Sequence, residues 1–222
     1  MARPPLNPWG DRRRARVGLL GGSFNPAHDG HRHVALEALR RLSLDEVWLL
    51  VSPQNPLKPV AGKAPLAERL DGAQRLVGRH PRLRATAIEA RLGTRFSADT
   101  LARLRTRFPR VGFVWLVGAD NLRQFHRWAR WAAIWHAVPI AILARGAYGG
   151  PVQAAKAARR FRHARRPARQ APRLAASPPP AWVFLHIRRH PASSSALRAR
   201  RRVAPCPGPF QESPPFPPPN PA

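Results

Sequence analysis

Residues 21–31 read GGSFNPAHDGH, and they combine two adjacent glycines with two histidines. An apolar segment that predicts a buried strand precedes them, and apolar residues spaced as on one helix face follow. A strand, a glycine turn and a helix in this order point backbone N–H groups at one spot, which suits an anion. Gly21 and Gly22 are expected to allow close approach and a positive φ. His28 and His31 lie three residues apart, so both rings could donate to phosphate oxygens.

A metal site is the alternative interpretation of His28 and His31. Zinc sites of this kind need a further Cys or His at a suitable spacing, and the neighbouring sequence has none. A single histidine that only satisfies a local hydrogen bond is common, whereas a pair around a glycine directly after a strand is much less so. We therefore expect phosphate chemistry, with no metal held by these side chains.

The composition sets outer limits on the function. The chain has 222 residues and a formal charge of +28, from 39 Lys and Arg against 11 Asp and Glu. Such a charge is compatible with binding to nucleic acid, but the arginines are dispersed and a GC-rich genome explains them as well. We expect nucleic acid to be an unlikely partner.

The chain has one cysteine, Cys206, which excludes a disulfide framework. No apolar run approaches the ~20 residues of a membrane span. A cytoplasmic, non-membrane protein is expected.

The segment Ser23-Phe24-Asn25-Pro26-x-His28-x-Gly30-His31 resembles the signature of the HxGH nucleotidyltransferases, and most closely that of bacterial nicotinate-nucleotide adenylyltransferases. Further motifs occur in the order that this family shows, from about residue 17 to residue 202. They are the proline-rich stretch that ends in Lys58, the segment around Ser97, the Gly118-Ala119-Asp120 stretch with Trp128 eight residues after Asp120, and Ser193-Ser194-Ser195-Ala196-Leu197-Arg198.

The resemblance implies two sets of binding residues. The set for ATP comprises Gly21, Gly22, Ser23, Phe24, His28, His31, Gly118, Asp120, Ser193, Ser194, Ser195 and Arg198. The set for nicotinate mononucleotide comprises Asn25, Lys58, Ser97, Trp128, Ala129 and Arg145. His28, His31 and Arg198 are the expected catalytic residues. On spacing alone, Trp128 would be a core residue like Trp131 and Trp135, and only the resemblance places a pyridine ring against it.

The sequence departs from the family at four motif positions. Phe96-Ser97 stands where the usual pair is Tyr-Thr, so the tyrosine hydroxyl is lost while the backbone donors at Ser97 are kept. Ser195 replaces Thr and Leu197 replaces Ile, and both changes are mild. A capped basic helix, with no ligand, is the alternative interpretation of the segment around Ser195.

The activity implied is transfer of the adenylyl group of ATP to nicotinate mononucleotide, giving nicotinate adenine dinucleotide and pyrophosphate, with Mg²⁺ accompanying ATP. The nucleophile is already an anion, so positioning and charge stabilisation suffice. Another adenylyl- or cytidylyltransferase of the superfamily, or a basic nucleic-acid-binding protein, are the alternatives. The sequence leaves open whether the protein forms a homo-oligomer.

These residues must be positioned by alternating strands and helices. Strands are predicted at 17–20, 46–51, 83–88, 111–117, 138–144 and 182–187, and helices at 31–42, 66–77, 97–108 (with Ser97 as a candidate cap), 128–137, 154–165 and 193–202. Continuous apolar strands alternating with helices predict an α/β, Rossmann-like nucleotidyltransferase fold, with a mostly parallel sheet covered on both faces. Residues 1–15 are expected to be a disordered basic N-terminus, residues 16–202 the nucleotidyltransferase domain, and residues 203–222 a disordered Pro-rich tail.

Overall fold

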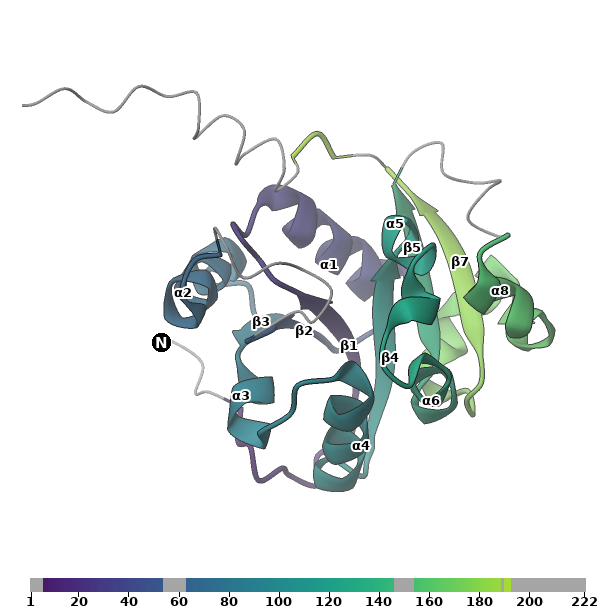
Figure 1. The fold of residues 1–222 in the computed structure, drawn as a ribbon, viewed down its shortest axis with the longest axis horizontal. Helices are drawn as coiled ribbons and strands as arrows, with labels where there is room; N and C mark the ends of the chain where they lie inside the picture. Colours follow the sequence, from purple (N-terminus) through teal and green to yellow (C-terminus); the bar gives the residue numbers. More distant parts are fainter. Residues whose placement is uncertain (1–5, 54–62, 146–153, 189, 193–222) are drawn as a thin grey trace, which may run out of the picture.

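The computed structural model describes residues 6–53, 63–145, 154–188 and 190–192. Its centre is a sheet with the strand order β3-β2-β1-β4-β5-β7-β6 (Figure 1). The strands are β1 (Ala15–Gly22), β2 (Glu46–Val51), β3 (Leu83–Thr86), β4 (Val111–Gly118), β5 (Ile140–Arg145), β6 (Arg165–Arg166) and β7 (Trp182–Ile187). Every pairing is parallel. The predicted α/β fold is confirmed, with a sheet that is parallel throughout.

Helices follow most of the strands. The α-helices are α1 (Asp29–Arg41), α2 (Leu66–Val77), α3 (Ile88–Leu92), α4 (Ser97–Arg107), α5 (Ala119–Leu122), α6 (Trp131–Ala137) and α8 (Lys156–Arg160). Within the described ranges, three segments are 3-10 helices, η1 (Phe125–Arg127), η2 (Arg162–Ala164) and η3 (Ala168–Ala176). None of the helices within the described residues is long and apolar enough to cross a membrane.

Two hydrophobic cores lie on the two faces of the sheet because successive strand residues point to opposite sides. Trp48 and Leu50 of β2 pack with residues of α3, α4 and α6, whereas Val47 and Leu49 pack with residues of α1, α2 and η3. Each of these four side chains is fully buried. Burying one such side chain contributes ~2 kcal/mol, so the two cores hold the strands firmly in register beneath the loops.

Strand β1 lies at the topological switch point of the sheet. The chain leaves β1 through α1 to β2 on one side, and after β3 it crosses to β4 on the other side of β1. The two connections therefore diverge at the carboxyl ends of β1 and β4, and a crevice at such a point is where open α/β sheets bind ligands. Residues 21–31, singled out from the sequence, stand at this point.

Several predicted boundaries differ from the structure. The strand predicted at 83–88 ends at Thr86, and Ile88 begins α3. The helix predicted at 128–137 begins only at Trp131, because Arg130 has a φ of 51° and Trp128 is extended. The helix predicted at 154–165 is the short α8 followed by η2, and the two-residue β6 makes the strand at 182–187 the seventh.

The N-terminal segment also differs from the expectation of disorder over residues 1–15, within the residues 6–14 that the structure describes. Leu6 is 7% exposed and belongs to the core on the α4 side. Arg107 of α4 donates to the carbonyl of Pro8. Gly10 has a φ of 92°, and a Cβ there would lie 1.9 Å from the carbonyl oxygen of Arg107. The segment therefore packs closely against α4, and the predicted tail 203–222 lies outside the described residues.

Candidate active site

The loop between β1 and α1 is shaped by close packing. Strand β1 continues through Gly22, and neither Gly21 nor Gly22 has the positive φ that the sequence suggested. The left-handed residue is Phe24, with a φ of 47°. A Cβ on Gly21 would lie 2.9 Å from the ring of Trp115, and one on Gly22 would lie 3.2 Å from the ring of Phe24. Neighbouring aromatic rings thus leave no room for a Cβ at Gly21 and little at Gly22, while the turn itself comes after them.

His28 and His31 stand together at the start of α1. Their ring centroids are 3.8 Å apart, and the ring of Phe24 lies 4.8 Å from that of His31. His28 is buried and His31 is half-buried. The backbone N–H of His28 donates to Nδ1 of His31 at 3.2 Å. Because Nδ1 accepts this hydrogen bond, a neutral His31 carries its proton on Nε2.

Gly30 allows a second chain segment to cross the start of α1. A Cβ at Gly30 would lie 2.7 Å from the carbonyl oxygen of Ala192. His33, one turn further along α1, donates from Nε2 to the carbonyl oxygen of Arg188 at 2.7 Å. The segment after β7 is therefore held beside the two histidines. It leads directly to Ser193, Ser194, Ser195 and Arg198, which lie outside the described residues.

The carboxyl end of β4 carries Gly118 and Asp120, two of the residues predicted to bind ATP. Gly118 ends β4, and the exposed Asp120 lies in the first turn of α5. A Cβ at Gly118 would lie 2.4 Å from a carboxylate oxygen of Asp120. A larger residue at position 118 would require the carboxylate of Asp120 to move from this position. Asp120 stands one strand away from the histidine loop, since β4 pairs with β1.

Trp128 stands outside α6, on the short segment that joins η1 to this helix. Its ring stacks on Phe125, with centroids 4.8 Å apart and planes 13° from parallel. The ring of Trp115 meets it edge-on at 6.4 Å. One face of Trp128 is therefore covered by Phe125, and only the other can carry a flat ligand. Trp135 does lie in the core, as predicted, while Trp131 is only partly buried against it.

An ion pair brings the start of α4 to this tryptophan segment. Asp99, in the first turn of α4, pairs with Arg130, two residues after Trp128. Arg130 also lies 6.0 Å from the ring centroid of Phe96. Ser97 is the first residue of α4, so it does not cap the helix, and Phe96 takes the cap position. Ser97 and the exposed Ala129 thus belong to two segments that contact each other.

The remaining predicted mononucleotide residues are placed only in part. Oδ1 of Asn25 accepts a hydrogen bond from the backbone N–H of Ala64 at 3.4 Å, so the loop before α2 reaches the histidine loop. Lys58 lies outside the described residues. Arg145 is the last residue of β5, and its side chain also lies outside the description. In the sequence Lys58 follows β2, whereas Arg145 ends β5, and the carboxyl ends of these parallel strands share one edge of the sheet.

Glu89 was missed in the sequence and is a buried acid beneath this edge. It lies in α3, is 7% exposed, and accepts a hydrogen bond from Oγ1 of Thr100 at 3.1 Å. Burial raises the pKa of Glu89 to about 7, while hydrogen bonds from Thr100 and Ser52 act in the opposite direction. Nothing in the local sequence distinguishes Glu89 from an exposed helical glutamate, because its burial depends on the packing of α3 between β2 and α4.

The described residues contain no group of three or more His, Cys, Asp or Glu side chains that could hold a metal ion. Mg²⁺ usually keeps several waters and binds through one or two carboxylates and substrate phosphates. Asp120 offers one carboxylate at the crevice. One carboxylate is enough for a Mg²⁺ ion that is bound mainly by nucleotide phosphates, but too few for a Mg²⁺ ion held by protein side chains alone.

The parallel sheet with a paired-histidine loop at its switch point defines a nucleotide-binding α/β protein. The sequence matches the cytidylyltransferase-like family over residues 19–200. It is 54% identical over 186 residues to a probable nicotinate-nucleotide adenylyltransferase of Cereibacter sphaeroides, covering 84% of this chain and 97% of that protein. It is 53% identical over 192 residues to the protein of the same name from Gluconacetobacter diazotrophicus, covering 86% of this chain and 88% of that protein.

Among solved structures, the fold is similar to that of Plasmodium falciparum nicotinic acid mononucleotide adenylyltransferase complexed with NaAD. The TM-score is 0.60 at 14% sequence identity, covering 84% of this chain and 83% of that chain. This likeness supports the fold, and the curated relatives carry the family assignment. The chain belongs to the nicotinate-nucleotide adenylyltransferase family of the cytidylyltransferase-like proteins.

Proposed function

We propose that this protein transfers the adenylyl group of ATP to nicotinate mononucleotide, giving nicotinate adenine dinucleotide and pyrophosphate. The observation that carries the proposal is the similarity to relatives named for this activity, which extends over most of the chain and nearly all of one of those relatives. The crevice at the ends of β1 and β4 is the place in such a sheet where nucleotides bind.

The chemistry needs no covalent intermediate. A phosphate oxygen of the mononucleotide attacks the α-phosphorus of ATP, a new P–O bond forms, and the bond to the bridging oxygen breaks as pyrophosphate leaves. Negative charge grows on the departing pyrophosphate. Nε2–H of His31, with its tautomer set by the bond at Nδ1, would donate to this charge. Mg²⁺, bound to the ATP phosphates and with Asp120 as a candidate contact, would neutralise further charge on them.

The mononucleotide would lie between Trp128 and the start of α4. Phe125 supports one face of the indole, so the pyridine ring would stack on the other. The first N–H groups of α4, at Ser97 and Ala98, have no acceptor within the helix. Donors of this kind suit the carboxylate of nicotinate, which accepts at both oxygens, whereas a carboxamide would present an NH₂ group to one of them. Each such mismatch costs ~1–3 kcal/mol.

The test is pyrophosphate release from ATP with a panel of mononucleotides. We expect kcat/KM for nicotinate mononucleotide to exceed that for nicotinamide mononucleotide by about 100-fold, as two unpaired groups imply.

A variant tests the stacking contact. Trp128→Ala should raise KM for the mononucleotide by about 10-fold, the scale of a stacking contact, with KM for ATP nearly unchanged. The control is Trp9→Ala, because Trp9 is 80% exposed on the N-terminal segment.

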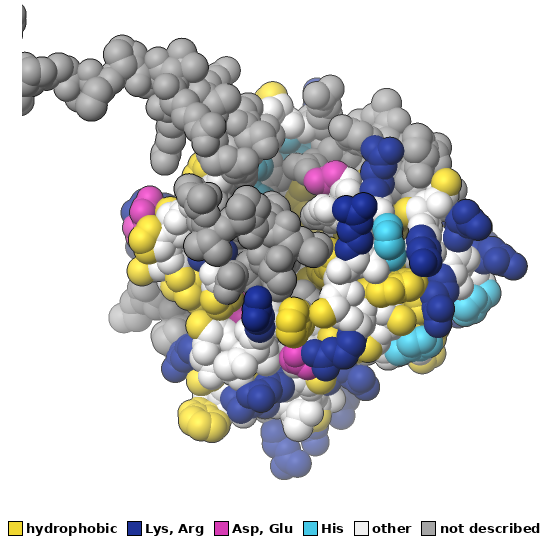
Figure 2. Space-filling view, viewed as in Figure 1, with side chains coloured by type: hydrophobic (Ala, Val, Ile, Leu, Met, Phe, Trp, Pro, Cys, Tyr) yellow, Lys and Arg dark blue, Asp and Glu magenta, His cyan; other side chains and the backbone are white. Residues whose placement is uncertain are grey.

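Two outcomes would redirect the proposal. Release with a different mononucleotide alone would indicate another nucleotidyltransferase of the same fold. No release with any substrate, together with tight binding to nucleic acid that weakens steeply with salt, would favour a polyanion-binding protein. Figure 2 shows Lys and Arg spread over the visible face, so weak, salt-sensitive binding alone would not be informative.

A further inference from the structure

Arg69 is a buried cation whose hydrogen bonds within the described residues all go to backbone carbonyls. It lies in the first turn of α2 and is 3% exposed. Its Nε donates to Ala64 at 2.8 Å, its Nη1 to Ser23 and Ser52 at 2.8 Å each, and its Nη2 to Pro53 at 3.2 Å. Among the described residues it has no carboxylate within salt-bridge distance. Burial lowers the pKa of Arg69.

The carbonyls that Arg69 binds belong to two different loops. Ser23 lies in the β1–α1 loop, five residues before His28, while Ser52 and Pro53 follow β2. The guanidinium is planar and rigid, so its donors hold these carbonyls at defined positions relative to each other. One side chain therefore joins the histidine loop to the loop that carries the predicted mononucleotide residue Lys58.

The connection continues through Ser52 to the start of α4. The carbonyl of Ser52 accepts from Arg69, and its side chain bonds to Glu89. Glu89 in turn accepts from Oγ1 of Thr100, which lies 2.9 Å from Oγ1 of Thr94. A chain of polar contacts thus runs beneath the crevice, from the histidine loop to the helix whose first N–H groups face the proposed carboxylate.

We propose that Arg69 is a positioning residue that holds the ATP-binding loop and the mononucleotide-binding loop in register; this inference rests on the proposed adenylyl transfer. A guanidinium buried without a carboxylate carries a desolvation cost that an apolar side chain would avoid. What the guanidinium supplies is a fixed geometry between two loops that share no strand. In-line attack depends on such geometry, because a displacement of ~1 Å can cost ~100-fold in rate.

The test compares Arg69→Met and Arg69→Lys with Arg84→Met. Arg84 is a second poorly exposed arginine, but it pairs with Glu46 at 3.1 Å, at the start of β2 and far from the crevice along that strand. At a temperature where all variants are folded, Arg69→Met should lower kcat by about 10–100-fold, the scale of misplaced reactants. Arg69→Lys should lose less, since an ammonium retains up to three donors. Arg84→Met should lose stability but keep kcat within about twofold.

Two further measurements separate positioning from general stability. Guanidinium ion, added to Arg69→Ala far below denaturing concentrations, should restore part of kcat and should not do so for Arg84→Ala. Hydrogen exchange of peptides containing Ser23 and Ser52 should accelerate in Arg69→Met and not in Arg84→Met. Wild-type kcat in Arg69→Met, or unchanged exchange in both peptides, would overturn the inference. Absence of activity in the unaltered protein would instead refute the proposed function, and the exchange measurement would still decide the role of Arg69.

Discussion

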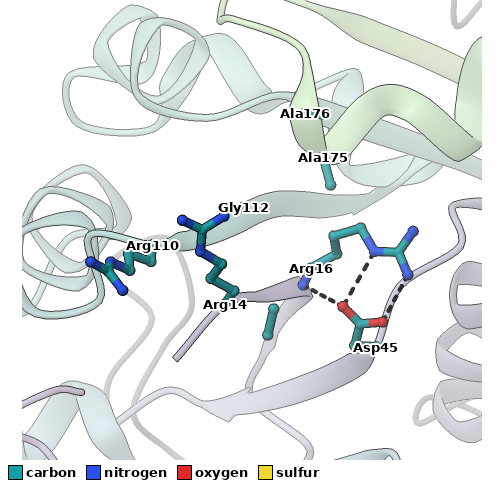
Figure 3. A pocket seen from close by; sticks show the side chains of 8 residues that line it. Arg14, Arg16, Asp45, Arg110, Gly112, Ala175 and Ala176 are labelled. Carbon is teal, nitrogen blue, oxygen red and sulfur yellow. Dashed lines mark hydrogen bonds and ion pairs between the residues drawn. The ribbon is translucent and has the colours of Figure 1, made fainter. Parts of the chain in front are cut away.

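Ionisable side chains around a pocket at the amino edge of the sheet are exposed, whereas several at the carboxyl edge are buried. At the amino ends of β1 and β4, a pocket of 450 Å³ is lined by Arg14, Arg16, Asp45 and Arg110 (Figure 3). Its one carboxylate already pairs with Arg16, at 2.8 Å, and the side chains of that pair are 48% and 45% exposed. At the carboxyl ends, by contrast, His28, Arg69 and Glu89 are each less than 9% exposed.

This difference shows that charge and hollow shape do not by themselves make a site. Exposed ion pairs are screened by water and salt and contribute little, ~0–1 kcal/mol. The carboxyl edge has instead the diverging connections of the switch point, so several loops converge there and hold polar groups out of water. A polar group that is buried and fully bonded is fixed in place, and a fixed group can act on a reacting phosphate.

The largest expected effect comes from a histidine of the carboxyl edge. His31→Ala should lower kcat by about 100–1,000-fold, the scale for losing one positioned donor to the transition state, with a much smaller change in the affinity for ATP. Steady-state kinetics at saturating substrates measure this. The matched control is His80→Ala, because His80 precedes β3 at the amino edge. Unchanged turnover in His31→Ala would remove the histidine pair from the mechanism.

The buried acid gives the next largest effect, on stability. The pKa of Glu89 is raised to about 7 from 4.5, so the folded protein holds this proton more tightly than the unfolded chain. The free energy of unfolding should then fall by up to ~3 kcal/mol as the pH rises from 4.5 to 7. Glu89→Gln cannot ionise, so its stability relative to wild type should rise with pH across this range in urea titrations. Parallel curves for both proteins would contradict the assignment.

The exposed acid of the amino edge should respond in the opposite direction. Hydrogen bonds from Arg16 hold the pKa of Asp45 below its ordinary value of 3.8. Its contribution to stability is therefore fully present above 3.8 and is lost as the pH falls through the lowered pKa of the folded protein. Asp45→Asn should be slightly less stable than wild type at pH 7, and the difference should shrink steadily as the pH falls below 3.8. Melting temperatures across this pH range test this, and a difference that stays constant into acid would refute it.

The smallest expected effect concerns activity at the amino edge. Arg14→Ala and Arg110→Ala alter the pocket without touching the loops at the other end of the strands. We expect kcat/KM to stay within about twofold of wild type, with slightly weaker salt-dependent attraction of the anionic substrates. A loss of tenfold or more would show that this edge takes part in the function and would end the contrast between the two edges.

Local sequence was sufficient for much of the scaffold. Strand β2, helix α2 and strand β7 have the bounds that their apolar patterns predict. The order of strand, histidine loop and helix at residues 21–31 was also predicted, because a buried strand and an amphipathic helix each have their own period. The left-handed conformation of Arg130 was not visible in the sequence, and with it Trp128 lies outside the predicted helix.

The sequence by itself determined the fold class and the family, because periodicity and ordered motifs are local, and it predicted the edge at which the site would form. Only the tertiary structure decided which groups are buried and with which residues they form hydrogen bonds. Gly21 is required by Trp115, and Gly30 by Ala192, across the fold. In the sequence nothing distinguishes Arg69 from the other polar residues of α2. In the structure it donates hydrogen bonds to the carbonyls of Ser23 and Ser52, which belong to separate loops. Burial and hydrogen-bond geometry are properties of the packed chain, so the spacing of residues in the sequence does not predict them.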